Sequence, residues 1–414
     1  MRMAFASIAS NRALRFVLLI GVLSFFADFT YEGARSVLGP FLLGLGASAT
    51  TIGIVTGFGE FAGYGLRLVS GPLADATKRY WPITIFGYVI QMAAVPALAL
   101  AGNWPLAAAL IILERIGKAI RNPPRDVMLS HAAQRVGGYG WAFGLHEALD
   151  QAGAMVGPLL VAAVLAWRGS YAIAFATLAV PAVINLVLVG VARLTYPNPS
   201  DLEGHAEPDA RSGLPRRYWI YLVAAMLIAA GFADYPLLAY HFARTGTVSM
   251  ETIPILYAVA MAVSGGGSLA LGKLFDRFGF VVLIFLTIIS ALFAPLIFFG
   301  GFWGALVGSA LWGLGMGGHE SIIPAAVAPM VGQEKRATAF GLFTAGYGFA
   351  WFLGSAVIGF LYDRSLVETV LFCLIAEGLA LIPLVVVWRS KIDDSGFATE
   401  KGNLGRANVF SRRT

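Results

Sequence analysis

The stretch VVLIFLTIISALFAPLIFF, from Val281 to Phe299, decides the fold class of this 414-residue chain. It contains no charged side chain, and apolar residues would cover nearly every face of a helix built from it. An apolar helix of about 20 residues crosses the roughly 30 Å hydrocarbon core of a bilayer, whereas a barrel strand alternates apolar and polar residues over about 10 positions. The stretch therefore predicts a transmembrane helix and argues against a β-barrel.

Similar apolar runs recur along nearly the whole chain. Hydrophobic residues make up 58% of it and charged residues 13%, against roughly 25% charged residues in a soluble domain. The sequence therefore predicts an all-α membrane protein with twelve transmembrane helices. We expect them near Ala13–Leu38, Thr50–Ala74, Trp81–Leu100, Trp104–Ile120, Trp141–Ala166, Tyr171–Val191, Tyr218–Phe242, Thr252–Leu274, Val281–Phe299, Phe302–Val327, Thr338–Leu361 and Val367–Trp388.

Lysine and arginine residues collect on one side of these predicted spans. That side carries Arg2, Arg12, Arg15, Lys78, Arg79, Arg135, the connector from Arg193 to Arg217, Lys273, Arg277, Lys335, Arg336, Arg389 and Lys391, and the other side carries Arg168, Arg244 and Arg364. Positively charged loops remain in the cytoplasm. We therefore expect both termini in the cytoplasm and the protein in the plasma membrane, which is the inner membrane of a bacterium. This topology explains the net charge of +6 without a nucleic-acid partner.

A polar segment rich in proline and glycine, TYPNPSDLEGHAEPDARSGLP from Thr195 to Pro215, divides the predicted spans into two sets of six. We predict an N-terminal six-helix bundle at residues 1–194, a cytoplasmic linker at 195–216, a C-terminal bundle at 217–390 and a disordered cytoplasmic tail at 391–414. Short repeats support two matched halves. Phe-Ala-Asp occurs at Phe26–Asp28 and Phe232–Asp234, and Ala-Phe-Gly-Leu begins at Ala142 and Ala339.

The loop between the second and third spans reads GPLADATKR from Gly71 to Arg79, and a weaker copy, GKLFDRFG, begins at Gly272. The first copy resembles the signature loop of the major facilitator superfamily, G-x-L-A-D-x-x-G-R-K, with Lys78 in place of Gly and Tyr80 in place of a basic residue. The resemblance implies two pseudo-symmetric six-helix bundles that alternate in access. It also implies a gating loop formed by Gly71, Asp75, Lys78, Arg79, Gly272, Asp276 and Arg277.

Two further stretches are similar to motifs of the drug/proton antiporter branch of this superfamily. Arg115-Ile-Gly-Lys-Ala119 is similar to R-x-x-Q-G, and Gly153 with Gly157-Pro158 matches part of the glycine spacing of the antiporter motif. Leu159 to Ala162 lack the closing pair of glycines. The similarity implies proton antiport and efflux.

Charged side chains at membrane depth are costly and mark functional or paired positions. Asp28, Glu32 and Arg35 share one face of the first span, and Glu60, Tyr64 and Arg67 repeat the spacing on the second. The resemblance implies that spans one, four, seven and ten line a central cavity. The proton-coupling candidates are Asp28, Glu32, Arg115, Asp234 and Glu320. The substrate-cavity candidates are Arg35, Glu60, Tyr64, Arg67, Glu114, Lys118, His146, Glu147, Asp150, Tyr235, His241 and His319.

A structural role remains an alternative for many of these groups. Asp28, Glu32 and Arg35 can form a self-contained network, and Glu60 with Arg67 can be an ion pair between helices. Arg121, Arg125 and Asp126 fit a cytoplasmic gate or loop anchor better than a substrate site. His146, His241 and Glu377 can be hydrogen-bonded packing residues.

These features predict a secondary transporter that couples proton entry to efflux of a small organic compound. The alternative is proton-driven uptake of an anionic metabolite or a metal chelate, and a receptor on the same scaffold also remains open. Zinc-protease, serine-hydrolase and P-loop motifs are missing from the sequence, so we expect no enzyme activity and no ATP-driven pumping. Cys373 is the single cysteine. We expect no cofactor or metal, a proton gradient as energy source, a functional monomer, and a substrate that the sequence does not identify.

Overall fold

The computed structural model describes residues 11–136, 139–199, 214–327, 330–331 and 336–410, without the side chains of 75, 134, 139–141, 336–338 and 391–410. Every regular element in these ranges is a helix. The first half contains α2 (Arg12–Arg35), α3 (Leu38–Gly44), α4 (Ala49–Gly65), α5 (Arg67–Thr77), α6 (Tyr80–Ala97), η1 (Leu98–Leu100), α7 (Trp104–Ala133), η2 (Gln134–Val136), α8 (Tyr139–Arg168), α9 (Tyr171–Thr177) and α10 (Ala179–Thr195).

The second half contains α11 (Arg216–Gly231), α12 (Tyr235–Thr245), α13 (Thr252–Phe278), α14 (Phe280–Ala291), α15 (Phe293–Phe299), α16 (Gly301–Glu320), α17 (Ile322–Ala325), α18 (Arg336–Arg364) and α19 (Leu366–Phe410). Several spans consist of two helices separated by a bend. In the seventh span α11 ends at Gly231, the backbone is extended at Phe232 and Asp234, and Asp234 caps the first turn of α12. Pro236 follows within that turn, where its missing N–H costs nothing.

The twelve predicted spans all appear as helical segments, which confirms the fold class. Nine segments of the described chain are long and apolar enough to cross a membrane by length and composition alone. The other three spans correspond to α4 with α5, to α7, and to α16 with α17. Charged residues interrupt α7, and glycines dilute the hydropathy of α4 and α16, because these helices face the interior of the protein.

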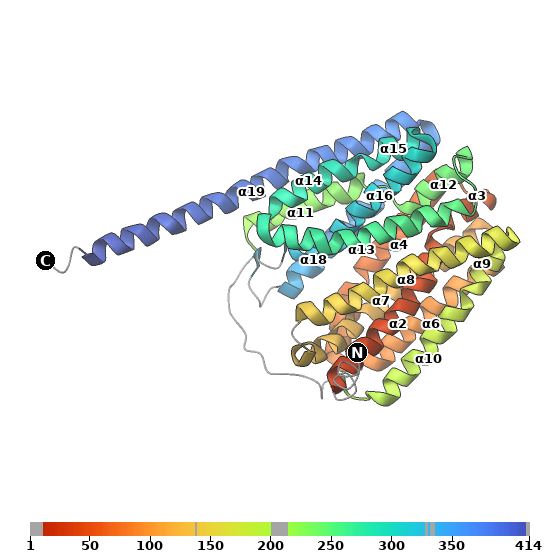
Figure 1. Ribbon diagram of the computed structural model, residues 1–414, viewed down its shortest axis with the longest axis horizontal. Helices are drawn as coiled ribbons and strands as arrows, with labels where there is room; N and C mark the ends of the chain where they lie inside the picture. Colours follow the sequence, from red (N-terminus) through yellow and green to blue (C-terminus); the bar gives the residue numbers. More distant parts are fainter. Residues whose placement is uncertain (1–10, 137–138, 200–213, 328–329, 332–335, 411–414) are drawn as a thin grey trace, which may run out of the picture.

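The contacts between the two bundles are symmetric. Span two (α4) packs on span eleven (α18), and span five (α8) packs on span eight (α13), as Figure 1 shows for α8 and α13. Span eight is the equivalent of span two in the second half, and span eleven is the equivalent of span five, so the two contacts are equivalent. This reciprocity is the signature of a pseudo-two-fold axis between the halves.

Apolar side chains cover the outside of the bundles and polar groups collect inside. Val183 and Val187 of α10 and Phe285 of α14 are at least half exposed, as expected of a surface in contact with lipid. Arg35, Arg115 and Asp234 are buried instead. This arrangement inverts that of a soluble protein and places the charges where the two halves meet.

Two segments are predicted to lie outside the membrane, and both domain assignments stay predictions. Residues 200–213 of the predicted linker lie outside the described residues. At the C-terminus α19 continues to Phe410 and projects away from the bundle in Figure 1, where the sequence predicted a disordered tail from residue 391.

Candidate functional site

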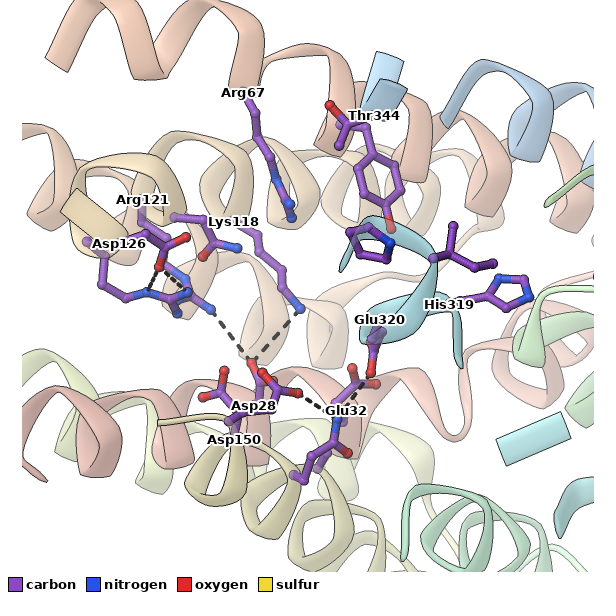
Figure 2. A pocket seen from close by; sticks show the side chains of 18 of the residues that line it. Asp28, Glu32, Arg67, Lys118, Arg121, Asp126, Asp150, His319, Glu320 and Thr344 are labelled. Atoms are coloured by element: carbon purple, nitrogen blue, oxygen red, sulfur yellow. Dashed lines mark hydrogen bonds and ion pairs between the residues drawn. The ribbon is translucent and has the colours of Figure 1, made fainter. Parts of the chain in front are cut away.

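A cavity of about 360 Å³ lies between the two halves (Figure 2). Most of its lining residues are charged or polar. They are Asp28, Glu32, Tyr64, Arg67, Lys118, Arg121, Asn122, Arg125, Asp126, Glu147, Asp150, Gln151, Ala154, Met261, His319, Glu320, Ile323, Pro324, Phe343, Thr344 and Tyr347. Figure 2 shows Arg67 and Lys118 reaching into the cavity from one side, with Asp28, Glu32 and Asp150 on the opposite side.

A smaller cavity of about 80 Å³ adjoins the first and shares five of its lining residues. Glu32, Tyr64, Arg67, Lys118 and Glu320 line both cavities. The smaller one adds Arg35, Glu60, Gly63, Arg115, Ala119 and Met316. Most of the predicted candidates on spans one, two, four and ten therefore lie around these two adjoining cavities.

At the end of the molecule where α3 meets α12, the halves are in direct contact. Gly39 of α3 lies so close to the backbone of Pro236 and Tyr240 in α12 that a side chain there would clash. Asp363 of α18 accepts hydrogen bonds from the backbone N–H groups of Ala49, at 3.2 Å, and Thr50, at 2.8 Å. The site is therefore sealed at this end, and its lining extends along α7 toward the opposite end.

Ion pairs at the sealed side of the site join the halves. Arg35 contacts Asp234 at 2.7 Å and Glu60 at 3.3 Å, and Glu60 also contacts Arg115 at 2.5 Å. The hydroxyl of Tyr257 donates to Glu32 at 2.5 Å. Because Asp234 and Tyr257 belong to the second half and the other groups to the first, these two contacts bridge the halves.

A second set of charges surrounds Asp28 within the first half. Its carboxylate lies 3.7 Å from Arg121 and 4.0 Å from Lys118. Arg121 donates to the side chains of Gln91, at 2.5 Å, and Tyr88, at 3.1 Å. Asp28, Lys118 and Arg121 therefore all line the cavity, and a change in the charge of Asp28 alters the electrostatic balance with the two bases of α7.

Arg67, which is partly buried, differs from Arg35 and Arg115 because no ion pair to it occurs among the described residues. Its guanidinium lies 5.1 Å from the centre of the Tyr64 ring, and its Nε has no hydrogen-bond partner. The alternative pairing of Arg67 with Glu60 is not formed, since Glu60 contacts Arg35 and Arg115 instead. Arg67 is thus available to a ligand.

Glu147 and Glu320 share one hydrogen-bond donor across the two halves. The Nε2 of Gln151 donates to Glu147 at 3.0 Å and to Glu320 at 3.1 Å. Neither carboxylate forms an ion pair within the described chain, and both are exposed to the cavity. Two carboxyl groups therefore face the same polar space and share the Gln151 amide.

His146 lies behind the cavity wall, in a chain of hydrogen bonds. Its Nε2 is 2.8 Å from the hydroxyl of Ser24, which accepts a hydrogen bond from Arg125 at 3.1 Å. The Ser24 hydroxyl can then donate to Nε2, which leaves the protonated Nδ1 facing Asp150 at 3.7 Å.

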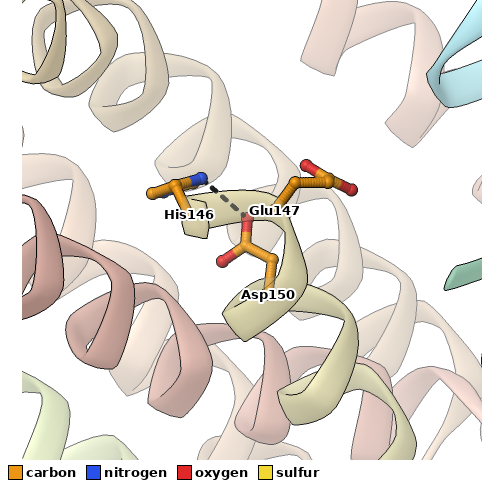
Figure 3. A group of neighbouring side chains, drawn as sticks. All are labelled: His146, Glu147 and Asp150. Atoms are coloured by element: carbon orange, nitrogen blue, oxygen red, sulfur yellow. Dashed lines mark ion pairs between the residues drawn. The ribbon is translucent and has the colours of Figure 1, made fainter. Parts of the chain in front are cut away.

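The donor atoms of His146, Glu147 and Asp150 lie within 4.8 Å of one another, which is a spacing that a metal ion could use. Figure 3 shows His146 and Asp150 facing each other, while the carboxylate of Glu147 points away from them. The Nε2 of His146 is already occupied by Ser24. Glu147 accepts a hydrogen bond from Gln151, whereas the Oδ1 of Asp150 is buried without a hydrogen-bond partner.

Other predicted site residues lie outside both cavities. The Tyr235 hydroxyl donates to the carbonyl of Ile253, and His241 is hydrogen-bonded to Tyr362 at 2.9 Å. Glu114 of α7 accepts a hydrogen bond from Gln91 of α6 at 2.7 Å, between these two helices. These side chains point into their own bundles. The sequence could not show this, because hydrophobic periodicity does not specify the rotation of each helix about its axis.

His319 does line the larger cavity and is hydrogen-bonded to Tyr347. Glu377 is buried within the second half, where Ser290 donates to it at 3.5 Å, consistent with a packing role. The polar residues Gln91, Gln151 and Tyr257 were missed. Uncharged side chains on apolar helices do not stand out, and only their spacing from the charged positions could have indicated them.

The two predicted gating loops lie away from the central site. Lys78 ends α5 in the left-handed conformation with φ 54°, and Lys78 and Arg79 line a separate cavity of about 450 Å³. Gly272, Asp276 and Arg277 lie in the last turns of α13, and none of the described loop residues lines the central cavity. The side chain of Asp75 lies outside the described part. A gating role for these loops stays a prediction.

Comparisons with known proteins agree with this architecture. The sequence profile of the Major Facilitator Superfamily matches residues 18–299 and 220–412. The uncharacterized protein Rv2265 of Mycobacterium tuberculosis is 41% identical over 382 residues, covering 91% of this chain and 93% of that protein. The uncharacterized MFS-type transporter MJ1317 of Methanocaldococcus jannaschii is 27% identical over 388 residues, covering 88% of this chain and 94% of that protein.

Two solved structures share the fold at low sequence identity. The nucleoside transporter NupG has a TM-score of 0.69 at 16% identity, covering 90% of this chain and 98% of that one. A bacterial homolog of the human lysosomal transporter Spinster, in an inward-facing and unoccupied conformation, has a TM-score of 0.68 at 16% identity, covering 92% and 98%. With two six-helix bundles, a charged site between them and a matching profile over most of its length, the chain belongs to the Major Facilitator Superfamily of membrane transporters.

Proposed function

We propose that the protein is a proton-coupled secondary transporter of a small, charged organic solute and works by alternating access between its two halves. The observation that carries this proposal is the polar cavity between the bundles, which is sealed at one end by contacts between α3 and α12 and between α4 and α18. Rocking of the halves about such a site exposes it to each side of the membrane in turn.

Proton coupling is supported by the charges that line the larger cavity. Six carboxyl groups line it, from Asp28, Glu32, Asp126, Glu147, Asp150 and Glu320, against four bases, Arg67, Lys118, Arg121 and Arg125. Water hydrates the surplus negative charge while the cavity is open. Enclosing it would leave unpaired charge in a medium of low dielectric constant. A proton or a cationic group on the solute removes that cost.

The contacts between the halves connect this charge to the conformational change. Glu32 accepts from Tyr257, and Asp234 pairs with Arg35, so both bridging contacts involve a carboxylate that a proton neutralises. Loss of that charge weakens the bridge at the sealed end. Protonation therefore favours the state in which the sealed end opens. The proton binds with different free energies to the two access states, and this difference drives the cycle.

We propose export as the direction of transport and the plasma membrane, with cytoplasmic termini, as the location. The described cavity then opens to the cytoplasm. Support comes from the partial antiporter motif, whose small residues Gly153 and Gly157 lie against the backbone of Phe25 and Phe29 in α2. This close packing of α8 on α2 matches the role expected of that motif.

Uptake of an anionic metabolite is the second candidate function. It is favoured by Arg67, which faces the cavity without an ion-pair partner among the described residues. A transporter with this function would take its proton and its solute in the same direction.

Proteoliposomes containing the purified protein and an internal pH dye test both functions. With an inward proton gradient, export predicts solute leaving pre-loaded vesicles as protons enter, whereas uptake predicts that added solute and protons enter together. Solute-independent fluorescence at every gradient, with correctly inserted protein, would contradict proton-coupled transport. The Glu368→Gln variant is a suitable control, because Glu368 pairs with Arg364 on the exposed surface.

A further inference from the structure

We propose that the central site binds a zwitterion, a small molecule that carries an ammonium group and a carboxylate a few bonds apart. This inference rests on the proposed transport function and specifies the class of its substrate. The starting point is that Arg67 and Glu320 line both connected cavities, yet no ion pair joins them. Two opposite charges that face one small space without touching leave room for a ligand with complementary charges.

The acidic side of the site is suited to an ammonium group. The carboxylates of Glu147 and Glu320 lie 3.0 Å and 3.1 Å from the same nitrogen, the Nε2 of Gln151. A ligand ammonium has three N–H donors and can replace this amide between the two carboxylates. The Oε1 of Gln151 is buried without a hydrogen-bond partner and is an additional acceptor nearby. Because Glu147 is in α8 and Glu320 in α16, the ammonium would connect the two halves.

The basic side of the site is suited to a carboxylate. Arg35 is occupied by Asp234 and Glu60, and Arg115 by Glu60. Arg67 alone among these arginines has no such partner in the described chain, and its Nε is buried without a hydrogen bond. A planar guanidinium binds a carboxylate through two parallel hydrogen bonds. Arg67 is therefore the group that would hold the anionic end of the ligand.

Ligands with a single charge match this site less well. A monoamine would leave Arg67 unpaired when the halves close around it, and a monocarboxylate would leave Glu147 and Glu320 without a cation. Each unpaired charge would then be enclosed at a cost of several kcal/mol. The volume of about 360 Å³ is at the small end of the range of ligand pockets, roughly 300–1,000 Å³. An amino acid or a dipeptide fits these requirements of charge and size.

The test measures binding to the purified full-length protein by thermal shift and calorimetry. The probes are the twenty common amino acids and dialanine, followed by analogues of each hit that lack the amine or the carboxylate. For L-leucine these analogues are 4-methylpentanoate and isoamylamine. We expect at least one zwitterion to bind, and its two analogues to bind roughly 10- to 100-fold more weakly, as expected for loss of a charged hydrogen bond.

Two variants assign the ends of the ligand. Arg67→Ala should weaken binding of the zwitterion about 10-fold or more and leave binding of the amine analogue nearly unchanged. Glu320→Gln should weaken the zwitterion and the amine analogue but not the acid analogue. Arg364→Ala, on the exposed surface, should change none of these affinities. Equal binding of the zwitterion and both analogues, or no loss in either site variant, would overturn the assignment.

Flux measurements separate this inference from the proposed function. Proton-coupled flux that only amines, anions or uncharged solutes support would overturn the zwitterion site and leave the transporter proposal intact. Zwitterion binding that depends on Arg67 and Glu320, without flux of that ligand or of protons, would support the site and contradict transport. Failure of every zwitterion to bind would overturn the site.

Discussion

Arg35 of α2 and Asp234 at the start of α12 form an ion pair in which the guanidinium Nη2 lies 2.7 Å from the carboxylate Oδ1. Both side chains are buried, and they come from opposite halves of the molecule. A charged hydrogen bond of this kind contributes more when it is withdrawn from water, and removal of one partner leaves a costly unpaired charge. The pair is therefore well placed to report on the change between the two access states.

Replacement of Asp234 by asparagine should lower proton-driven transport at least roughly 10-fold, because Arg35 loses its shortest charged contact and the bridge between the halves weakens. The amide keeps the size of the side chain, so expression and the number of inserted molecules should be unchanged. Initial rates of flux in proteoliposomes measure the effect, with Glu368→Gln as the control. Wild-type rates in Asp234→Asn would show that the ion pair has no part in the cycle.

The Asp28→Asn variant should insert normally and lose proton-coupled flux. Its carboxylate faces the cavity and lies 3.7 Å from Arg121, so the neutral amide mimics a permanently protonated state. Exchange of labelled solute without a gradient should survive better than gradient-driven transport. If an imposed pH difference still accelerates flux in this variant as in the wild type, Asp28 does not carry the proton.

The hydrogen bonds of Asp363 should help to keep the sealed end closed. Its carboxylate accepts hydrogen bonds from the Thr50 N–H, at 2.8 Å, and the Thr50 hydroxyl, at 2.7 Å, and so caps α4 from the other half of the molecule. Loss of a cap costs about 1 kcal/mol, which corresponds to a roughly fivefold change in the ratio of two states. Asp363→Ala should increase the population open at this end by about that factor.

Spin labels at exposed positions on the two halves, Gly102→Cys and Met250→Cys, measure this population by their distance distribution. The native Cys373 is fully buried and should not react with the label. Arg364→Ala in the same labelled background is the matched control beside Asp363. An unchanged distance distribution in Asp363→Ala would show that the cap does not hold the end closed.

We expect the same substitution to have different effects at two glycines of α4. A Cβ atom at Gly57 would lie 2.8 Å from the Cβ of Ser355 in α18, whereas at Gly65 it would meet nothing within 4 Å. Gly57→Ala should therefore destabilise the sealed state by roughly 1–3 kcal/mol, while Gly65→Ala should be neutral or slightly stabilising. Thermal unfolding and the spin-label distances should both separate the variants. Equal behaviour would mean that α4 and α18 are not held in close contact.

The fold was predictable because most spans are long, apolar and bounded by charge, as in Val281–Phe299. The sequence also indicated that Asp28, Glu32 and Lys118 share a site, since charges at membrane depth must meet water or a partner. It did not show that His241 pairs with Tyr362 away from the cavity. That depends on the break in the seventh span at Asp234, which sets the direction of α12.

The partners of the charged groups were less predictable than the charges themselves. Tyr257 donates a hydrogen bond to Glu32 and Gln151 donates one to Glu320, each in the opposite half of the molecule. Nothing in the local sequence distinguishes these two residues from packing residues. Pairing between helices separated by more than a hundred residues depends on register and rotation, which hydropathy does not specify.

At Gly53, Gly57 and Gly359 the backbones of α4 and α18 approach so closely that an added Cβ would clash with the backbone or the Cβ of the facing helix. Such a seam has no width for a file of water molecules, and protons cross membranes along water files or ionisable groups. The close contact of α4 and α18 leaves no water path between these two helices beside the charged site. In the proposed proton-coupled cycle, a proton would therefore cross by way of the cavity carboxylates, so the coupling would depend on this glycine packing as well as on charge.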